Sequence, residues 1–364
     1  MTLRKIYEQD VEDIATGASF MGAGGGGDPY VGKLMAKSAI KRGNPVSLIN
    51  VDELDPEAIY APVACMGAPS VMTEKFPKGD EFQRVLQAVA DQQHKKIGGI
   101  FPIEAGGVNS MIPFVLGAQT GIPVVDVDSM GRAFPELQMT TLHLAGVTVP
   151  PMAITDEKGN MGLLDTVTDK WAELLARDMT VEMGATAVVS LYSTTGEKLQ
   201  EAGIAGILTK CQQVGEIVRQ HSKGHDWQLQ QLHEITNSLH LFDGKVVDVS
   251  QTTSGGFNHG QITIDGLNSF SGKTMTIDYQ NENLVAHVDG QLAVSVPDLI
   301  CLADIDSLTP FTAEDVRYGK RMAVFGLPCD EKWRTPAGIE TVGPRYFGYD
   351  YDYQPVEELA KERG

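Results

Sequence analysis

The sequence has few cysteines and little positive charge, and both shortages narrow the class of protein. Its four cysteines, at positions 65, 211, 301 and 329, form no Cys-x-x-Cys pair. This spacing speaks against a zinc knuckle or a redox-active pair. The chain has 29 Lys and Arg residues against 48 Asp and Glu residues, a formal net charge of −19. We therefore expect neither nucleic acid nor an anionic membrane as a partner, because both are bound by basic surfaces.

Long apolar runs are also missing. No stretch approaches the length of a transmembrane helix, and residues 1–10 lack the apolar core of a signal peptide. The hydrophobic fraction of 42% is ordinary for a globular protein, and 364 residues have room for two or three domains. These features predict an acidic protein of the reducing cytoplasm.

Glycine, by contrast, is concentrated at one place. Five glycines stand within the six residues 22–27, and Asp28 and a proline follow directly. Apolar residues at helical spacing predict one helix over 11–18 and another over 30–40. Asp28 can cap the second helix, whose free N–H groups would attract an anion. The stretch matches neither a phosphate loop nor a dinucleotide motif that follows a strand. It is either a ligand-contacting loop or a tight turn between two helices.

Between residues 45 and 126, short apolar runs alternate with helical patterns. Strands are predicted at 45–50, 61–69, 97–103 and 122–126, and helices at 81–94 and 110–120. Runs that are apolar on both faces are typical of buried parallel strands. The alternation predicts an α/β N-terminal domain with a mostly parallel sheet. Three strands end in polar or small residues, and ligands bind at the carboxyl ends of such strands, so we expect a site at this edge.

The second half of the chain changes character. Residues 187–192 fit either a strand or a buried helix, and 224–231 fit a linker or a short helix. From residue 240 onward, strand-length runs separated by Asp-Gly turns at 243–244, 265–266 and 289–290 predict a mainly β C-terminal domain, a sandwich or a barrel. Five aromatic residues near the end predict a tail that docks on the first domain. The expected divisions are an α/β domain over 1–165, a helical extension of it over 166–232, a mainly β domain over 233–342 and the docking tail over 343–364.

Two segments at predicted strand ends carry candidate chemistry. Glu104 ends one strand and is followed by two glycines and by Asn109 and Ser110, which could cap the next helix. Asp126 and Asp128 would point to the same side of another strand, close to a cationic arginine. Clustered carboxylates can hold a divalent cation or act as general base and acid. A plain strand–turn–helix joint and an ion-paired loop are the alternatives.

The candidate site residues follow from these two segments and the glycine-rich loop. The catalytic candidates are Glu104, Asp126 and Asp128. The candidates for binding a small-molecule substrate are Gly24, Gly25, Gly26, Gly27, Asp28, Asn109, Ser110, Arg132 and Glu136. A divalent metal ion could join them, although no motif requires one, and the sequence identifies no other cofactor.

Several motifs together resemble the S-methyl-thiohydantoin desulfurase family. They are Gly24-Gly-Gly-Gly-Asp-Pro-Tyr30, Met66-Gly-Ala-Pro69, Glu104-Ala-Gly-Gly-Val-Asn-Ser110, Met130-Gly-Arg-Ala-Phe-Pro-Glu136 and Gly343-Pro-Arg-Tyr-Phe-Gly-Tyr-Asp350. The resemblance implies an α/β domain, a β-rich domain and hydrolytic loss of methanethiol from an S-methylated thiohydantoin, which gives a hydantoin. It also implies hydantoinase/oxoprolinase proteins as partners. The chain departs from the family pattern at Ala105 and Ser129, where smaller residues are common.

Two other functions stay open at this point. One is a nucleotide-binding enzyme or subunit that uses the glycine loop for phosphates and partners a hydantoinase or oxoprolinase. The other is a non-catalytic binding protein, although clustered carboxylates at strand ends are not typical of one. We also expect the chain to form a homo-oligomer.

Overall fold

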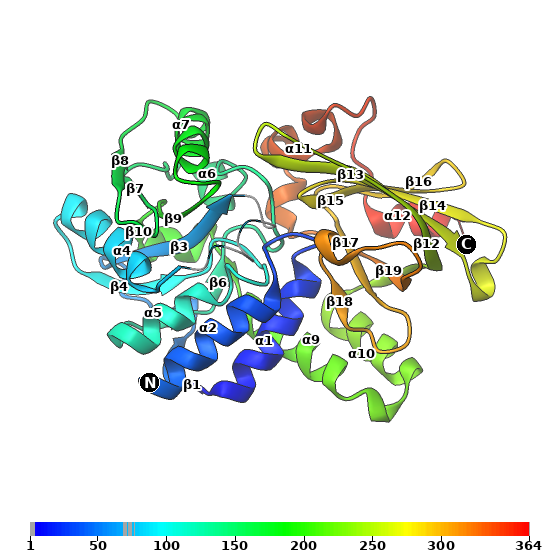
Figure 1. Ribbon diagram of the computed structural model, residues 1–364, viewed down its shortest axis with the longest axis horizontal. Helices are drawn as coiled ribbons and strands as arrows, with labels where there is room; N and C mark the ends of the chain where they lie inside the picture. Colours follow the sequence, from blue (N-terminus) through cyan, green and yellow to red (C-terminus); the bar gives the residue numbers. More distant parts are fainter. Residues whose placement is uncertain (1–3, 68–70, 72–74, 76, 364) are drawn as a thin grey trace.

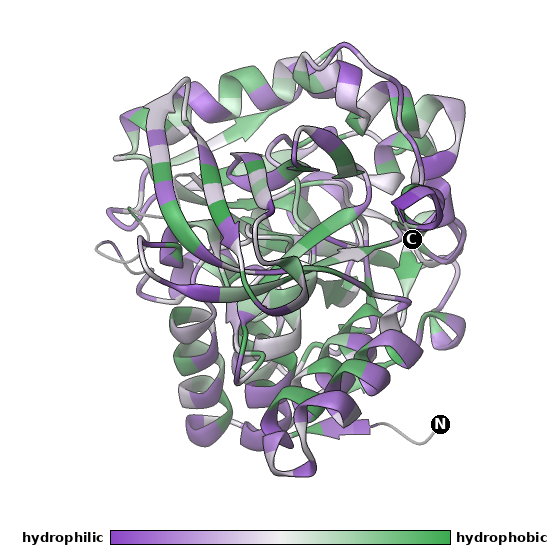
Figure 2. Cartoon of the chain, turned by 90° about the vertical axis from the view of Figure 1, so that its right-hand side faces the viewer, coloured by the Kyte–Doolittle hydropathy of each residue, from purple (hydrophilic) through white to green (hydrophobic). Residues whose placement is uncertain are grey.

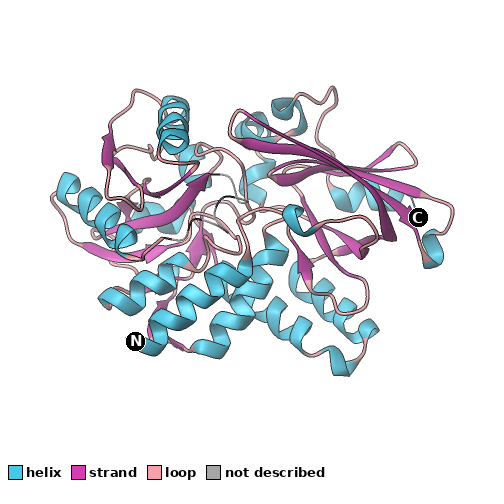
Figure 3. Ribbon diagram, viewed as in Figure 1, coloured by secondary structure: helices cyan, strands magenta, loops and turns pink. Residues whose placement is uncertain are grey.

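The chain folds into an α/β N-terminal part and a β-rich C-terminal part that lie side by side (Figure 1). This is a computed structural model, and it describes residues 4–67, 71, 75 and 77–363. Helices surround the first sheet, whereas the second is built almost wholly from long strands (Figure 3). The predicted fold class is confirmed.

The first sheet has parallel strands at its centre and antiparallel strands on both sides. Its order is β1-β2-β5-β4-β3-β9-β7-β8, and β10 pairs with β3. The parallel strands are β2 (Val46–Ile49), β5 (Val124–Val125), β4 (Ile97–Phe101) and β3 (Ile59–Gly67). The antiparallel strands are β1 (Arg4–Ile6), β9 (Thr186–Ser190), β7 (Met152–Thr155), β8 (Met161–Leu164) and β10 (Thr194–Thr195). Strand β9 makes 187–190 of the open segment 187–192 a strand, and residues 191–192 follow it. Ala68 and Pro69 lie outside the described residues.

Helices pack around this sheet. They are α1 (Glu8–Met21), α2 (Pro29–Arg42), α4 (Asp80–Gln93), α5 (Ile112–Thr120), α6 (Thr141–Leu144), α7 (Asp169–Glu182), α8 (Gly196–Ala202), α9 (Ile207–Arg219) and α10 (His225–Thr236). Helix α1 packs between α2 and α9, and α2 packs on α5. The Asp28 carboxylate caps α2 as expected, because its Oδ1 accepts the Tyr30 N–H over 2.8 Å. Two short strands, β6 (Val127–Asp128) and β11 (Ile204–Ala205), pair with each other.

The second sheet is a single antiparallel sheet of eight strands, in the order β16-β15-β14-β13-β12-β19-β17-β18. The strands are β12 (Leu239–Ser254), β13 (Phe257–Gly266), β14 (Thr274–Gln280), β15 (Glu282–Val288), β16 (Gln291–Ser295), β17 (Leu299–Asp304), β18 (Pro310–Phe311) and β19 (Arg321–Leu327). Buried and partly exposed residues alternate along β14. Hydrophobic and hydrophilic residues likewise follow one another along the strands of this sheet in Figure 2. Strand β15 also packs against β17, so the sheet curls around its own core.

One turn prediction was wrong. Residues 243–244 lie inside β12, where Gly244 pairs with both β13 and β19. The turn that ends β12 is formed by Gly255 and Gly256, both with positive φ. An Asp-Gly pair is typical of a hairpin turn. No turn forms here, because strand β12 is paired on both sides at this point and continues through the Asp-Gly pair.

The last residues run back over both parts of the molecule. They form α11 (Pro336–Val342), the 3-10 turn Pro344–Phe347 and α12 (Val356–Arg363). Tyr346 reaches the N-terminal part, where its hydroxyl donates to Glu136 over 2.8 Å. Tyr349 and Tyr351 pack instead against an apolar cluster of the second sheet. None of the described helices combines the length and apolar character that crossing a membrane requires.

Candidate active site

A small cavity opens where the carboxyl ends of β3 and β4 meet the first residue of β15. Its volume is about 90 Å³. The glycine-rich loop, the turn after β4 and the segment that follows β6 all contribute to its wall. The lining residues are Gly26, Gly27, Ala64, Cys65, Met66, Gly67, Ile103, Glu104, Val108, Asn109, Met130, Phe134, Pro135, Glu136, Leu137, Arg177, Val189, Leu191, Asn281 and Glu282.

Glu104 is the central carboxylate of this cavity. It is buried, and its Oε1 accepts a hydrogen bond from Asn109 Nδ2 over 2.7 Å. Burial raises the pKa of Glu104 to about 7, although the Asn109 amide, the Phe134 N–H and the Arg132 charge oppose this shift. A carboxyl group with such a pKa is partly ionised at neutral pH and can accept a proton from water.

Glu282 is the second carboxyl group of the cavity, and it comes from the C-terminal sheet. It is buried, and no described group hydrogen-bonds to its Oε2. Burial, together with the negative charge of Glu104, raises the pKa of Glu282 well above its ordinary value, against the opposing effect of Arg132. Burial therefore favours the protonated form of Glu282. Glu104 has a hydrogen bond to its carboxylate and Glu282 Oε2 has none, a difference of environment that can separate a base from an acid in one site.

Asn109 and Ser110 hold the turn that carries Glu104. Asn109 also accepts the Cys65 N–H over 2.8 Å and donates to the Cys65 carbonyl over 3.3 Å, which fixes its amide between β3 and Glu104. Ser110 Oγ accepts the Gly106 N–H and donates to the Glu104 carbonyl. Asn109 faces the cavity, whereas Ser110 bonds only within its own turn.

The glycine-rich loop joins the two halves of the site. The Gly26 carbonyl accepts the Val108 N–H over 2.8 Å, and the Gly24 carbonyl accepts the Ala313 N–H over 2.8 Å. A Cβ atom on Gly25 would stand 2.2 Å from Glu282 Oε1. Gly26 and Gly27 line the cavity, and Asp28, the cap of α2, lies outside its lining.

Asp126 and Asp128 lie behind the cavity wall rather than in it. Asp126 Oδ1 accepts the Leu208 and Thr209 N–H groups at the start of α9, over 2.7 and 3.2 Å. Asp128 is fully buried, and its Oδ2 accepts the Gly131 N–H over 2.8 Å. Burial raises the pKa of Asp128 well above its ordinary range. Asp126 thus caps a helix, and Asp128 braces the turn before Arg132.

Arg132 is fully buried and faces backbone carbonyls. Its guanidinium donates to the carbonyls of Asn283 over 2.9 Å and Asp298 over 2.8 Å, in the C-terminal part of the chain. It also packs on the Phe134 ring, 4.7 Å from the ring centroid. Its charge favours the ionised forms of Glu104 and Glu282 and so lowers the pKa of each, which makes Arg132 a support of the site from behind.

Glu136 lies at the rim of the cavity. Its carboxylate forms an ion pair with Lys170 and accepts hydrogen bonds from Gln138 and Tyr346. These partners, led in effect by Lys170, hold its pKa below the ordinary value in spite of burial. Glu136 is therefore charged at neutral pH and connects the rim to the C-terminal tail.

Sequence reasoning missed Glu282, Asn281 and Arg177. Glu282 begins a strand of the second sheet, far along the chain from the motifs that predicted the site. Arg177 projects from α7, where its guanidinium donates to the Pro135 carbonyl over 3.0 Å and stacks on Phe257. No local pattern marks these residues, since only the folding of one part on the other brings them to the cavity.

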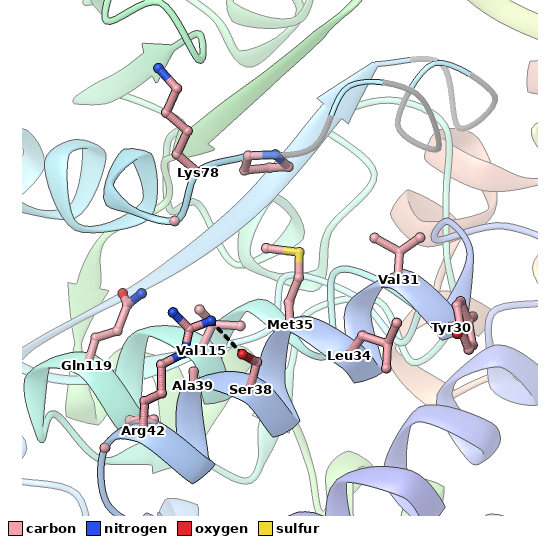
Figure 4. A pocket seen from close by; sticks show the side chains of 14 residues that line it. Tyr30, Val31, Leu34, Met35, Ser38, Ala39, Arg42, Lys78, Val115 and Gln119 are labelled. Carbon is pink, nitrogen blue, oxygen red and sulfur yellow. Dashed lines mark hydrogen bonds between the residues drawn. The ribbon is translucent and has the colours of Figure 1, made fainter.

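A larger hollow lies elsewhere, between α2, α5 and the segment before α4. It measures about 820 Å³ and is lined mainly by apolar side chains such as Leu34, Met35 and Val115, with Arg42 and Lys78 at its edges (Figure 4). None of its described lining residues carries a carboxylate, so the small cavity is the better candidate for chemistry. Within the described ranges, no group of three or more His, Cys, Asp and Glu side chains is arranged to hold a metal ion.

Comparison with known proteins agrees with this architecture. The N-terminal domain model of the S-Me-THD-like family matches residues 9–166, and its C-terminal domain model matches residues 167–356. A crystal structure of a protein from Chromobacterium violaceum is 21% identical, with a TM-score of 0.83, and the match covers 97% of this chain and 100% of that one. That likeness shows the fold alone. No curated protein matches the chain. Since the two family models cover nearly its whole length, the chain belongs to the S-Me-THD-like family.

Proposed function

We propose that this protein is a hydrolase that acts on a small cyclic amide, with an S-methylated thiohydantoin as the substrate. Water replaces the methylthio group on the ring carbon, and the products are a hydantoin and methanethiol. The observation that carries the proposal is a pair of buried carboxyl groups that line one small cavity: Glu104, with a pKa near 7, and Glu282, whose pKa is raised well above its ordinary value. Membership of the S-Me-THD-like family supports the substrate class.

Glu104 is the general base of the proposed reaction. Its carboxylate takes a proton from water as the water oxygen bonds to the ring carbon that carries sulfur, and the electron pair of the ring C=N bond moves to nitrogen. That nitrogen takes the remaining hydroxyl proton, and the oxygen then forms the carbonyl as sulfur leaves. Asn109 keeps the accepting oxygens in place through its 2.7 Å hydrogen bond.

Glu282 is the general acid. As the carbon–sulfur bond breaks, the electron pair leaves with sulfur and the Glu282 proton converts it to methanethiol. The proton taken up by Glu104 then restores Glu282 by transfer within the site. In the net reaction one water hydrogen ends on sulfur, the other ends on the ring nitrogen, and the oxygen becomes the new carbonyl.

The size and charge of the cavity favour this reaction over nucleotide binding. Sites for drug-sized ligands usually measure ~300–1,000 Å³, whereas this cavity measures about 90 Å³. The ionised form of Glu104 also repels phosphate oxygens, which carry the same charge. A hydantoinase or oxoprolinase remains a proposed partner that would act on the released hydantoin ring.

The test is release of methanethiol from an S-methylated thiohydantoin, followed with a thiol reagent and by chromatography of the hydantoin. We expect Glu104→Gln and Glu282→Gln to lower kcat by ~10²–10⁴-fold, the usual contribution of acid–base catalysis. Glu81→Gln is the matched control, because Glu81 is also a buried glutamate but accepts the Lys78 and Gly79 N–H groups at the start of α4 and lies outside the cavity lining. Absence of turnover by the wild-type protein on any hydantoin or thiohydantoin would refute the proposal, and a thermal shift with ATP and Mg²⁺ would then test nucleotide binding.

A further inference from the structure

Arg177 is the one basic side chain among the described residues that line the small cavity. It projects from α7, and its side chain is only 13% exposed. The sequence pointed instead to Arg132 as the cation that binds substrate, but the guanidinium of Arg132 lies behind the cavity wall and donates to backbone carbonyls. A substrate in the cavity therefore meets Arg177 and not Arg132.

Three neighbours hold the guanidinium of Arg177 in place. Its Nε donates to the carboxylate of Glu173, with which it forms an ion pair, and its Nη2 donates to the Pro135 carbonyl over 3.0 Å. The ring of Phe257 stacks on the guanidinium, with 4.1 Å between its central carbon and the ring centroid. The group is therefore oriented before any ligand arrives, which is the condition for strong electrostatic stabilisation of a reacting molecule.

The guanidinium also has donors left over for a ligand. It carries five N–H groups, and its partners among the described groups accept three of them: the Glu173 carboxylate, the Pro135 carbonyl and, over 3.4 Å, the Gly256 carbonyl. One N–H on each terminal nitrogen stays without an acceptor in the part of the chain that the structure describes. Since Arg177 lines the cavity and is largely buried, these two N–H groups can donate to an oxygen atom inside it.

We propose that Arg177 binds the ring carbonyl oxygen of the thiohydantoin and stabilises the negative charge that develops on it, an inference that rests on the proposed function. When the water oxygen bonds to the ring carbon that carries sulfur, the electron pair of the C=N bond moves to nitrogen. In the ring tautomer whose C=N nitrogen is bonded to the carbonyl carbon, this charge spreads onto the carbonyl oxygen. Arg177 keeps all its protons, and its hydrogen bonds to that oxygen strengthen as the charge grows, which lowers the barrier.

The same contact selects the substrate. A site built to hydrogen-bond one polar atom discriminates strongly against a molecule that lacks this atom, because the buried donors are then left unpaired. The ligand class that fits is therefore a five-membered cyclic amide with a carbonyl group beside the ring nitrogen that receives the electron pair.

Calorimetric binding of two rings that are not turned over tests the contact. Hydantoin carries the carbonyl oxygen in question, and ethyleneurea is the same ring without it. Arg177→Gln should weaken the binding of hydantoin by ~10–100-fold, the equivalent of one hydrogen bond to a charged group, and should leave the binding of ethyleneurea unchanged. The double variant Glu173→Gln/Arg177→Gln, which leaves no unpaired carboxylate behind, should bind both rings as Arg177→Gln does.

Arg219→Gln is the matched control for these variants. Arg219 also forms an ion pair with a buried carboxylate, that of Asp13, over 2.8 Å, but it projects from α9 and lies outside the cavity lining. It should bind both rings as the wild type does.

Methanethiol release separates this inference from the proposed function. Arg177→Gln should lower kcat by ~10²–10³-fold, the usual cost of losing one donor to a developing charge. Turnover by the wild type together with an unchanged kcat in Arg177→Gln would overturn the role of Arg177 alone. Equal weakening of hydantoin and ethyleneurea would also overturn it, because the substitution would then only disturb the cavity wall. A wild-type protein that neither binds hydantoin nor releases methanethiol would refute the proposed function and this inference together.

Discussion

The amide of Asn109 donates to the carboxylate of Glu104 over 2.7 Å while the other side of the same amide binds the backbone of Cys65. Strand β3 therefore fixes the position of the amide independently of its hydrogen bond to the carboxylate. Its hydrogen bond stabilises the charged form of Glu104 against the effect of burial. Asn109 acts in this way as a positioning residue that tunes the proposed base.

We predict that Asn109→Ala raises the pKa of Glu104 above its value near 7. Loss of a hydrogen bond to the ionised form leaves burial less opposed, so the carboxylate ionises at higher pH. The acidic limb of the pH profile of kcat/KM should move to higher pH, as methanethiol release would measure. Ser110→Ala is the control, because Ser110 bonds only within the turn backbone. An unmoved acidic limb in Asn109→Ala would remove Asn109 or Glu104 from the proposed roles.

We predict that Glu104→Gln raises the free energy of unfolding, relative to that of wild type, more at high pH than at low pH. The pKa of Glu104 is raised from 4.5 to about 7 on folding, so the folded state holds its proton more tightly. The resulting stabilisation of the wild type is complete below pH ~4.5 and is lost as the pH rises through ~7. At ~1.4 kcal/mol per pKa unit, the variant should gain up to about 3 kcal/mol on wild type between pH 4.5 and pH 8.

Denaturant unfolding at the two pH values measures this difference. Glu197→Gln, a change of an exposed carboxylate outside the cavity lining, is the control. A free energy of unfolding for Glu104→Gln that follows wild type at both pH values would mean that Glu104 ionises normally.

The sequence was sufficient to predict the elements that depend on local pattern. The buried parallel strands, the helices beside the glycine-rich loop and the Asp28 cap all follow from the spacing of nearby residues. The position of Glu104 also follows from the sequence, because a carboxylate that ends a buried strand lies at the edge of the sheet. Asp126 also ends a predicted buried strand, but its carboxylate accepts a hydrogen bond from the start of α9, some eighty residues later.

Long-range contacts account for what the sequence could not predict. Glu282 reaches the cavity only because the second sheet packs on the glycine-rich loop, where the Asn283 N–H donates to the Ala23 carbonyl over 2.8 Å. Arg132 resembles a substrate-binding cation by residue type, yet backbone carbonyls of the C-terminal part surround it. Neither relationship leaves a periodic pattern, because the partners are more than a hundred residues apart.

We predict that Tyr346→Phe loosens the C-terminal tail. The Tyr346 hydroxyl donates to Glu136 and accepts from Gln138 and Lys170, each over 2.8–3.0 Å. Its loss should lower the free energy of unfolding by about 1–2 kcal/mol and speed proteolytic cleavage near residue 346. Tyr351→Phe is the matched control, because the buried Tyr351 hydroxyl has no hydrogen-bond partner among the described groups and its removal should be neutral. Equal effects of the two substitutions would contradict the role given to the Tyr346 hydroxyl.

The last prediction concerns the close approach of the glycine-rich loop to the turn that carries Glu104. Gly26 and Gly290 have the same φ of +79°, but their surroundings differ. A Cβ on Gly26 would lie 2.2 Å from the Gly106 Cα, whereas nothing lies within 4 Å of a Cβ on Gly290. Alanine at either position costs ~1–2 kcal/mol for the left-handed backbone alone.

We therefore expect Gly290→Ala to lower the free energy of unfolding by about that amount and to keep wild-type turnover. Gly26→Ala should lower it by at least twice as much, because backbone atoms must also move apart. The displaced turn would carry Glu104 away from Glu282, so kcat should fall as well. Denaturant unfolding and methanethiol release measure the two effects. Equal losses of stability in the two variants would mean that the loop can move without displacing the turn that carries Glu104. Gly26 would then be required only for its positive φ and not for the close approach to Gly106.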